Sequence, residues 1–410
     1  NKKDSANQIG ASAARSTQRH SGTSPRHNTV SADRTPSCPT LGWLYRPLGC
    51  NLKLCSMPLD FNASALLARR PFLACLLAAA ACPAALAASP AQQRKAATAG
   101  KGDGGNALLE RVNAATDMPA LAKGARGEAV LRAQVLLDRA WFSSGEIDAV
   151  FGANMQRSVN AFQKARGLTT SGRLDAATWQ ALQGDASPPA PVLVEYTLQA
   201  LDTAGPFEAL PKDTMERANL KALGFESVQE ALGEKFHCSP AWLRRANPGS
   251  SFAAGDTLVV PAVALDHAGK APTRAASLRI DKVGRVLSVL DKYSAVLAAF
   301  PISMGGRSDP LPVGQMDIKN AAKNPVFTFD PDLLKGTKDS DRKAVLPPGP
   351  NSPVGVYWLG LSKPHWGIHG TPEPARVGTA ESNGCIHLTN WDVLRLADVV
   401  KTGFVVDVHA

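Results

Sequence analysis

The sequence predicts a multidomain α+β protein with a small helical bundle, a β-α-α-β segment and a mostly β domain that carries one packed helix. Its 410 residues exceed what one hydrophobic core usually holds. Two stretches rich in Pro, Gly and Ala, at 184–192 and 266–275, break the chain. Apolar spacing is helical in the first unit and strand-like in the last. The folded units are therefore expected at about 107–183, 192–265 and 275–410.

The residues ahead of these units are expected to direct export and to stay outside the fold. Residues 1–56 are rich in Ser, Arg, Asn and Thr, which favours disorder, and we interpret them as upstream sequence outside the working protein. Residues 57–87 contain an arginine pair, an apolar run and a small-x-small cleavage site, which is typical of a secretory signal. The run is short and broken by Pro83, which disfavours a membrane span. Lipid attachment at Cys82 is an alternative, although the leucine expected three residues earlier is absent. The Ala/Gly/Lys-rich stretch 88–106 predicts a linker.

The net charge of +10 does not predict a nucleic-acid partner. Residues 1–56 carry eight Lys and Arg against two acidic residues, whereas residues 88–410 carry 35 against 32. The folded part is nearly neutral and has no basic run with interleaved aromatic residues. With 44% apolar and 20% charged residues, the composition is that of a soluble globular protein.

The first unit has apolar residues at helical spacing in three stretches, with Asp175 as a candidate cap of the third helix. The residues that share these faces are Val130, Gln134 and Leu137, then Met155, Val159 and Phe162, then Trp179 and Leu182. From RGEAVLRAQVLL to LDAATWQAL, the unit resembles the peptidoglycan-binding-like three-helix module. Ala149 stands where that family has the glycine of Asp-Gly, and Met155 where threonine is usual. These departures concern ligand affinity rather than the fold.

The second unit is expected to contain two capped helices followed by a strand. Ser227 with Glu230 predicts a capping box, and Ser239 followed by Pro240 predicts the start of another helix. The stretch ANPGSSFAAGDTLVVP then turns into a strand. The unit resembles the LysM-like segment that precedes the catalytic domain in many cell-wall transpeptidases. A helix-turn-helix is the competing interpretation, but only two adjacent arginines would face a phosphate backbone.

The third unit begins with strand patterns in SLRIDKVGRVLSVLD and AVLAAFPIS, and further strands are expected in VGVYWLGL and GFVVDV. One helix is expected near the C-terminus, with Thr389 or Asn390 as cap and Asp392 near its positive end. Its apolar face consists of Val393, Leu396, Ala397 and Val400. Residues 309–355 are expected to be a long loop that could cover a cleft.

Cys385 lies in the stretch ESNGCIHLTNWD, just ahead of this helix. Only Cys238 and Cys385 follow the predicted export signal, so no disulfide framework is expected and a reactive thiol is favoured. A bridge between these two cysteines is an alternative. A thiol attacks a carbonyl as thiolate, which at neutral pH requires a base or a positive neighbour. His369, in WGIHGT at a strand end, is the favoured base, and His387 is the alternative.

The residues around Cys385 complete the candidate site. A turn at Gly384 leaves backbone N–H groups free to meet an oxyanion, and Ser382 and Asn383 can hydrogen-bond within the loop. His365 is expected at the rim. The H-x-x-x-H and C-x-H spacings raise a zinc site, but the intervening Gly and Pro oppose a helix that would present both histidines, so no metal or cofactor is expected.

The stretch IHGTPEPARVGTAESNGCIHLTNWD resembles the active-site signature of the L,D-transpeptidase catalytic domain family, the YkuD-like or ErfK group. The likeness covers about 275–410. It implies that Cys385 is the nucleophile and His369 the base. It also implies that Gly384 and Cys385 line the oxyanion hole, and that a backbone carbonyl of the Gly370 region orients the imidazole.

Four residues are candidate substrate contacts: Trp366, Arg376, Asn383 and His387. Arg376 lies on the loop between the two catalytic candidates and is suited to a carboxylate. Two of the four depart from the commoner family pattern, because Asn383 replaces a histidine and His387 replaces an arginine or asparagine.

The resemblance implies a periplasmic L,D-transpeptidase of a Gram-negative bacterium. Cys385 would attack the carbonyl of the L-centre donor residue of a peptidoglycan tetrapeptide and release D-alanine. The acceptor amine would belong to a second stem peptide or to a lysine of an outer-membrane lipoprotein. A hydrolase that uses the same residues, acting as carboxypeptidase or amidase, is the nearest alternative. A non-catalytic peptidoglycan-binding protein is another.

Overall fold

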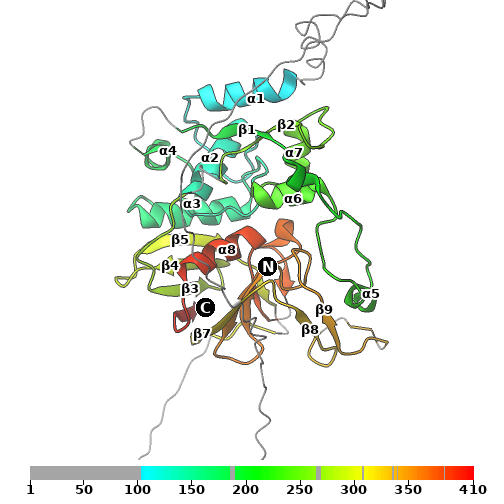
Figure 1. Cartoon of the computed structure of the whole chain (residues 1–410). Helices are drawn as coiled ribbons and strands as arrows, with labels where there is room; N and C mark the ends of the chain where they lie inside the picture. The colour runs from blue at the N-terminus through cyan, green and yellow to red at the C-terminus, as the bar shows by residue number, and fades with distance from the viewer. Residues whose placement is uncertain are drawn as a thin grey trace, which may run out of the picture. The chain divides into compact units, whose positions relative to one another are not determined.

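The computed structural model describes residues 103–184, 190–264, 269–306, 309–334, 337–338, 340–382 and 384–410 (Figure 1). All of them belong to one compact unit. The predicted upstream sequence, the export signal with Cys82, residues 88–102 of the linker, and Asn383 lie outside the described residues.

Helices α2, α3 and α4 form the predicted bundle around a core that includes the fully buried Trp179. Asp175 caps α4, as predicted, by accepting a hydrogen bond of 2.8 Å from the N–H of Thr178. A helix that was not predicted, α1, starts at Asp103, so the linker expected over 88–106 ends earlier than predicted. Its apolar side chains pack on the middle segment, which makes this stretch regular. The bounds are α1 Asp103–Ala114, α2 Glu128–Arg139, α3 Ala153–Ala165 and α4 Ala176–Gln183.

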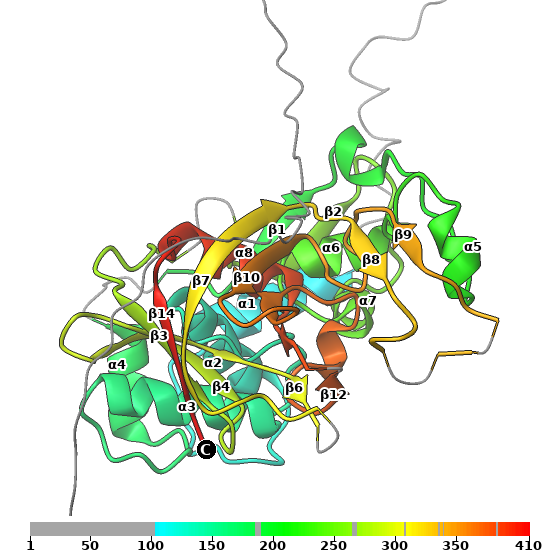
Figure 2. The ribbon, with the colours of Figure 1, turned by 90° about the horizontal axis from the view of Figure 1, so that it is seen from below.

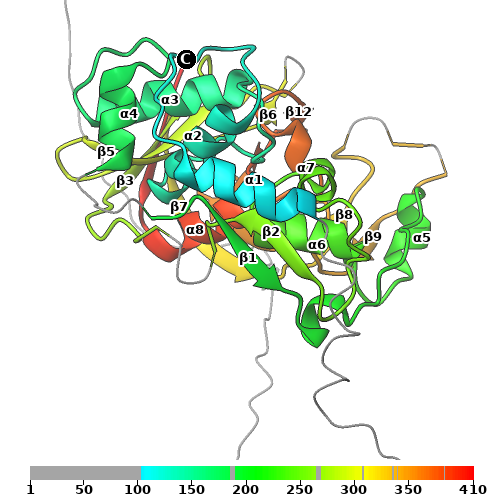
Figure 3. The same ribbon diagram turned by 90° about the horizontal axis from the view of Figure 1, so that it is seen from above.

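The middle segment has the predicted β-α-α-β order, with two short helices, η1 and α5, inserted after the first strand. Strands β1 and β2 pair antiparallel over their full length, and α1 lies beside them (Figure 3). The bounds are β1 Leu193–Thr197, η1 Ala200–Thr203, α5 Thr214–Ala218, α6 Val228–Lys235, α7 Pro240–Ala246 and β2 Thr257–Pro261. The assignment of this segment to the LysM family stays a prediction.

The predicted caps of the middle segment are present, with one difference. Ser227 caps α6 and Ser239 caps α7 through their hydroxyl groups. The carboxylate of Glu230 accepts from the N–H of Glu226 at 2.6 Å rather than from Ser227, so the capping box is only half formed.

The last segment is built on an eight-stranded mixed sheet with the strand order β13-β11-β10-β7-β14-β3-β4-β5. The pairs β14–β3 and β11–β13 are parallel and the others antiparallel. Helix α8 contacts β10 and β11 and is capped by Thr389, one of the two predicted caps. The bounds are β3 Ser277–Asp281, β4 Val286–Leu290, β5 Val296–Pro301, β7 Gly314–Lys323, β10 Tyr357–Leu361, β11 Gly367–His369, β13 Ile386–His387, α8 Asn390–Val399 and β14 Val405–His409.

Two short strand pairs stand outside this sheet. β6 (Met304–Gly305) pairs with β12 (Glu381–Ser382), and β8 (Phe327–Phe329) pairs with β9 (Ala344–Leu346). Figure 2 shows β8 and β9 next to α5, with which β9 is in contact.

The prediction of a long loop over 309–355 is wrong, because this segment contains β7, β8 and β9. β7 lies inside the large sheet, between β10 and β14. Only Met316 and Ile318 of its ten residues are buried, so the sequence has no sustained apolar alternation there. β8 and β9 pack Phe329 and Leu346 against the middle segment. Backbone pairing with distant strands, which hydrophobic periodicity does not report, makes this segment regular.

Helix α8 is held by both upstream segments. The hydroxyl of Ser143, next to the helical bundle, donates to Asp392 at 2.7 Å. Arg395 pairs with Asp138 of α2 at 3.2 Å, and His237 of the middle segment lies 3.1 Å from the same carboxylate. Burial raises the pKa of Asp392 to about 6. The helical bundle and the middle segment therefore both contact α8, the helix that follows Cys385 and β13.

Candidate active site

The parallel pair of β11 and β13 places the cysteine and histidine candidates next to each other. The register pairs Ile368 with Ile386 and His369 with His387. Both isoleucines are fully buried in the core, and side chains alternate along a strand, so both histidines point to the other face. Cys385 comes two residues before His387 and falls on the same face by this alternation. It is a diagonal neighbour of His369 across the pair.

His369 is buried and oriented by a backbone carbonyl. It is 3% exposed, and its Nδ1 lies 2.7 Å from the carbonyl oxygen of Gly370. Because a carbonyl only accepts, Nδ1 carries the hydrogen and Nε2 keeps its lone pair. The ring stacks on Trp358 of β10 at 5.2 Å between centroids. Burial, together with His387, lowers the pKa of His369 well below its usual value, against the effect of the Gly370 hydrogen bond. The imidazole is therefore in its neutral, basic form at neutral pH.

His387 is in ring contact with His369, with the centroids 4.4 Å apart and the planes tilted by 47°. Its backbone N–H donates to the carbonyl of Ser303, and its carbonyl accepts from the N–H of the same residue. Burial lowers the pKa of His387 to about 4, although the nearby Glu373 raises it. His387 is thus neutral as well, and it supplies no positive charge to a thiolate at neutral pH.

Cys385 is half-buried and carries a free thiol. The Sγ–H group donates to the carbonyl of His365 at 3.5 Å. Burial raises the pKa of the Cys385 thiol, and the N–H of Gly367 lowers it by hydrogen bonding. Within the described residues, no hydrogen bond joins Sγ to either imidazole. The resting group is therefore a protonated thiol that needs a base. Cys238 is also free and fully buried, so the bridge considered as an alternative is absent.

The turn that carries the cysteine is held by short contacts. Gly384 has φ +111°, a conformation that favours glycine, and its carbonyl accepts from the N–H of Gly305 at 3.2 Å. The hydroxyl of Ser382 donates to the carbonyl of Cys385 at 2.6 Å and closes the turn. In the described part of the chain, the N–H groups of Gly384 and Cys385 make no recorded hydrogen bond to another residue's carbonyl. The indole of Trp366 lies over Gly384, 3.5 Å from where a Cβ would be.

Arg376 is exposed and forms an ion pair of 3.0 Å with Glu373 on its own loop. The guanidinium of Arg376 therefore pairs with the carboxylate of Glu373 and makes no hydrogen bond to Cys385 within the described residues. Ser303 holds this loop, because its hydroxyl donates to the Arg376 carbonyl at 3.3 Å and accepts from the N–H of Gly378 at 3.1 Å. His365 is exposed at the rim, as expected.

Sequence reasoning missed Trp358, Ser303 and the backbone groups of His365 and Gly367. Their contacts depend on which strands become neighbours, and no local spacing in the sequence encodes that. Among the described residues, no three His, Cys, Asp or Glu side chains are grouped to hold a metal ion. In the same residues, no helix is long and apolar enough to cross a membrane.

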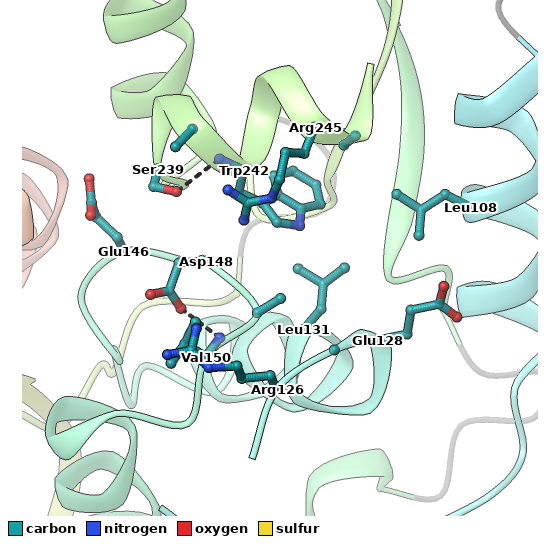
Figure 4. A pocket seen from close by; sticks show the side chains of 14 residues that line it. Leu108, Arg126, Glu128, Leu131, Glu146, Asp148, Val150, Ser239, Trp242 and Arg245 are labelled. Atoms are coloured by element: carbon teal, nitrogen blue, oxygen red, sulfur yellow. Dashed lines mark hydrogen bonds between the residues drawn. The ribbon is translucent and has the colours of Figure 1, made fainter. Parts of the chain in front are cut away.

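Two cavities in the described part of the molecule lie elsewhere. One cavity, of about 630 Å³, is lined by Arg126, just before α2, by Leu131 of α2, and by Trp242 and Arg245 of α7 (Figure 4). The other, of about 960 Å³, lies between the middle segment and Trp391 of α8. Neither is lined by the cysteine or histidine candidates.

Comparisons with known proteins identify two parts of the chain. A family model described as "L,D-transpeptidase catalytic domain" matches residues 276–408. A second model, described as "Putative peptidoglycan binding domain", matches residues 126–182.

Curated relatives carry matching names. "Putative L,D-transpeptidase YkuD" of Bacillus subtilis is 31% identical over 175 residues, which cover 42% of this chain and 88% of the relative. The protein with the same name in Bacillus licheniformis is 30% identical and covered to 88%. A crystal structure of the L,D-transpeptidase (residues 123–326) from Xylanimonas cellulosilytica is 14% identical, with a TM-score of 0.31, and the match covers 72% of this chain and 98% of that one.

Proposed function

The chain belongs to the YkuD family of L,D-transpeptidases, and from this premise we propose that it is a periplasmic enzyme that forms a thioester on Cys385 with a peptidoglycan tetrapeptide. The observation that carries the proposal is the register of β11 and β13, which brings Cys385 beside His369 on one face of the sheet. The predicted export signal over 57–87 supports the periplasmic location.

In the proposed reaction, Nε2 of His369 takes the thiol proton of Cys385, and Sγ attacks the carbonyl of the L-centre donor residue. The carbonyl oxygen becomes an oxyanion, which we assign to the N–H groups of Gly384 and Cys385, since neither donates to a carbonyl of the described residues. The intermediate collapses as the bond to D-alanine breaks, and the imidazolium gives its proton to the leaving amine. An acceptor amine then attacks the thioester carbonyl and passes a proton to Nε2 of His369. The new amide forms as the C–S bond breaks, and the imidazolium returns a proton to Sγ of Cys385.

His369 is favoured over His387 as the base because of its hydrogen bond to Gly370. That bond fixes the tautomer that leaves Nε2 basic. No side-chain hydrogen bond is recorded for His387 among the described residues. We assign His387 and Trp366 to the walls of the substrate site, and Arg376 to its outer rim. A substrate contact by Asn383 stays a prediction. Ser382 acts by closing the nucleophile turn.

The acceptor is proposed to be the amine of a second stem peptide, which gives a cross-link, or a lysine of an outer-membrane lipoprotein. The module matched at 126–182 supports a polymeric wall substrate, because it would keep the enzyme on the material that it modifies. Water is the competing acceptor, and it would make the protein a carboxypeptidase or amidase.

A carbapenem tests the nucleophile, because it acylates a reactive thiol and the adduct is visible by intact mass. We expect one adduct on the unmodified protein and none on Cys385→Ala. The adduct should form far more slowly on His369→Ala than on His387→Ala, because His387 contacts the ring of His369 but takes no proton from the thiol. An adduct that persists on Cys385→Ala refutes the assignment. Incubation with a disaccharide-tetrapeptide and a D-amino acid then separates transfer from hydrolysis by the mass of the product.

A further inference from the structure

The side chain of Asn390 packs against the backbone of Gly370, whose carbonyl binds Nδ1 of His369. Asn390 is the first residue of α8 and is fully buried. Its Oδ1 accepts from the N–H of Val356 at 3.2 Å. The same oxygen lies so close to Gly355 and Gly370 that a Cβ would come within 2.2 Å of it at Gly355 and 2.1 Å at Gly370. The amide therefore packs directly on the backbone of the residue whose carbonyl binds the histidine.

The other end of the Asn390 amide reaches into the middle segment. Its Nδ2 donates to Oε1 of Glu234, on α6, at 2.8 Å and to the carbonyl of Pro350 at 3.1 Å. Both partners of Nδ2 accept and the partner of Oδ1 donates, so only one orientation of the amide satisfies the site. Burial raises the pKa of Glu234 to about 8, although the Asn390 hydrogen bond lowers it. At neutral pH the contact is mainly between two uncharged groups.

These contacts form a continuous path to the candidate base. Glu234 holds Asn390, Asn390 packs against Gly370, and the carbonyl of Gly370 binds Nδ1 of His369. We infer that Asn390 and Glu234 are positioning residues for His369, so that the middle segment helps to orient the catalytic imidazole. This inference depends on the proposed role of His369 as the base.

The same helix offers a matched control contact. Glu230, one turn before Glu234 on α6, accepts from Nδ2 of Asn351 at 2.8 Å. Asn351 also donates to the carbonyl of Gly224. Like the bond between Asn390 and Glu234, this hydrogen bond joins an asparagine amide of the last segment to a glutamate of α6. The other acceptor of Asn351 is Gly224 of the middle segment, so neither of these two hydrogen bonds reaches Gly370. Glu230 also accepts from the N–H of Glu226 at 2.6 Å, so removal of its carboxylate should cost at least as much stability as removal of the carboxyl of Glu234.

The experiment measures how fast iodoacetamide alkylates Cys385 in the full-length protein between pH 5 and 10, with the peptide quantified by mass spectrometry. The variants are Glu234→Ala, Glu234→Gln, Glu230→Ala and the reference His369→Ala, and a thermal melt accompanies each. His369→Ala should move the midpoint of the profile to higher pH, because the thiol then ionises without its base. Glu234→Ala should move it in the same direction and lower the rate at pH 7 by about tenfold.

Glu234→Gln keeps an oxygen that accepts from Asn390 and should restore the normal profile. Glu230→Ala should lower the melting temperature at least as much as Glu234→Ala, because it also removes the hydrogen bond from the N–H of Glu226, and it should leave the profile unchanged. The inference is overturned if Glu234→Ala and Glu230→Ala share one profile, or if Glu234→Gln behaves like Glu234→Ala. A profile that His369→Ala does not move would instead refute the base role in the proposed function.

Discussion

The ion pair between Arg395 and Asp138 is expected to be the strongest polar contact between the helical bundle and α8. Asp138 is 1% exposed. Nη1 of Arg395 lies 3.2 Å from its carboxylate, and Nη2 donates to its backbone carbonyl at 2.7 Å. Burial raises the pKa of this carboxyl, but Arg395 and His237 together lower it by more than burial raises it, so the pKa lies below its ordinary value. The group is therefore charged in the folded protein and depends on its partners.

Arg395→Met tests this dependence while it keeps an unbranched side chain over Trp141, whose ring centroid lies 4.5 Å from the guanidinium carbon. The substitution leaves the buried carboxylate of Asp138 with the hydrogen bond to His237 and the nearby charge of Arg139. Removing one partner of a buried pair usually costs about 3–5 kcal/mol, and His237 should keep the loss near the lower end. In Arg395→Met combined with Asp138→Asn, the carboxylate of Asp138 is removed together with its partner, so part of this loss should be recovered. The carboxyl of Asp392, whose pKa Arg395 also lowers, contributes equally to the loss in both variants.

Urea unfolding at pH 7, followed by tryptophan fluorescence, measures all four members of this double-mutant cycle. The expected coupling is at least about 1.5 kcal/mol. If Arg395→Met costs less than about 1 kcal/mol, or if the losses of the single variants simply add, the charge of Asp138 does not depend on Arg395 and the reasoning fails.

Three further predictions concern protonation, backbone strain and thiol reactivity. Glu234 has a pKa of about 8 against an ordinary 4.5, so the native state binds more protons than the unfolded state between these values. Glu234 therefore contributes stability that is fully present below pH 4.5 and is lost as the pH rises through 8. In urea titrations from pH 6 to pH 8, the free energy of unfolding of the unmodified protein should fall by about 2 kcal/mol more than that of Glu234→Gln. An equal fall in both proteins would contradict this. Ala149 has φ 66°, where glycine is less strained, so Ala149→Gly should raise the free energy of unfolding by about 0.5 kcal/mol, and a loss of stability would show that its methyl group matters more. Burial also raises the pKa of Cys238, so iodoacetamide should label Cys385 in the native protein and reach Cys238 only after unfolding, whereas equal labelling rates would be incompatible with the buried position.

Local features of the sequence were sufficient for the helices α2, α3, α4, α6, α7 and α8, for several strands and for the candidate nucleophile, whereas α1, η1 and α5 were missed. Asp175, Ser239 and Thr389 cap helices where the sequence predicts caps, because a cap is an interaction between residues two or three apart. The same holds for Ser382, whose hydroxyl binds within its own turn. The signature around Cys385 is likewise a contiguous stretch.

Only the tertiary structure decided which distant residues meet. The sequence predicted a strand end at His369 and a turn at Gly384 before Cys385, and the parallel register of β11 and β13 decided that the two residues face the same side. β7 forms because β10 and β14 pair with it on both sides, and its own exposed polar side chains do not predict it. The contact of Asn390 with Glu234 joins residues from separate segments. Spacing along the chain reports interactions within one element, whereas pairing between elements is set by long-range packing and backbone hydrogen bonds that no single stretch contains.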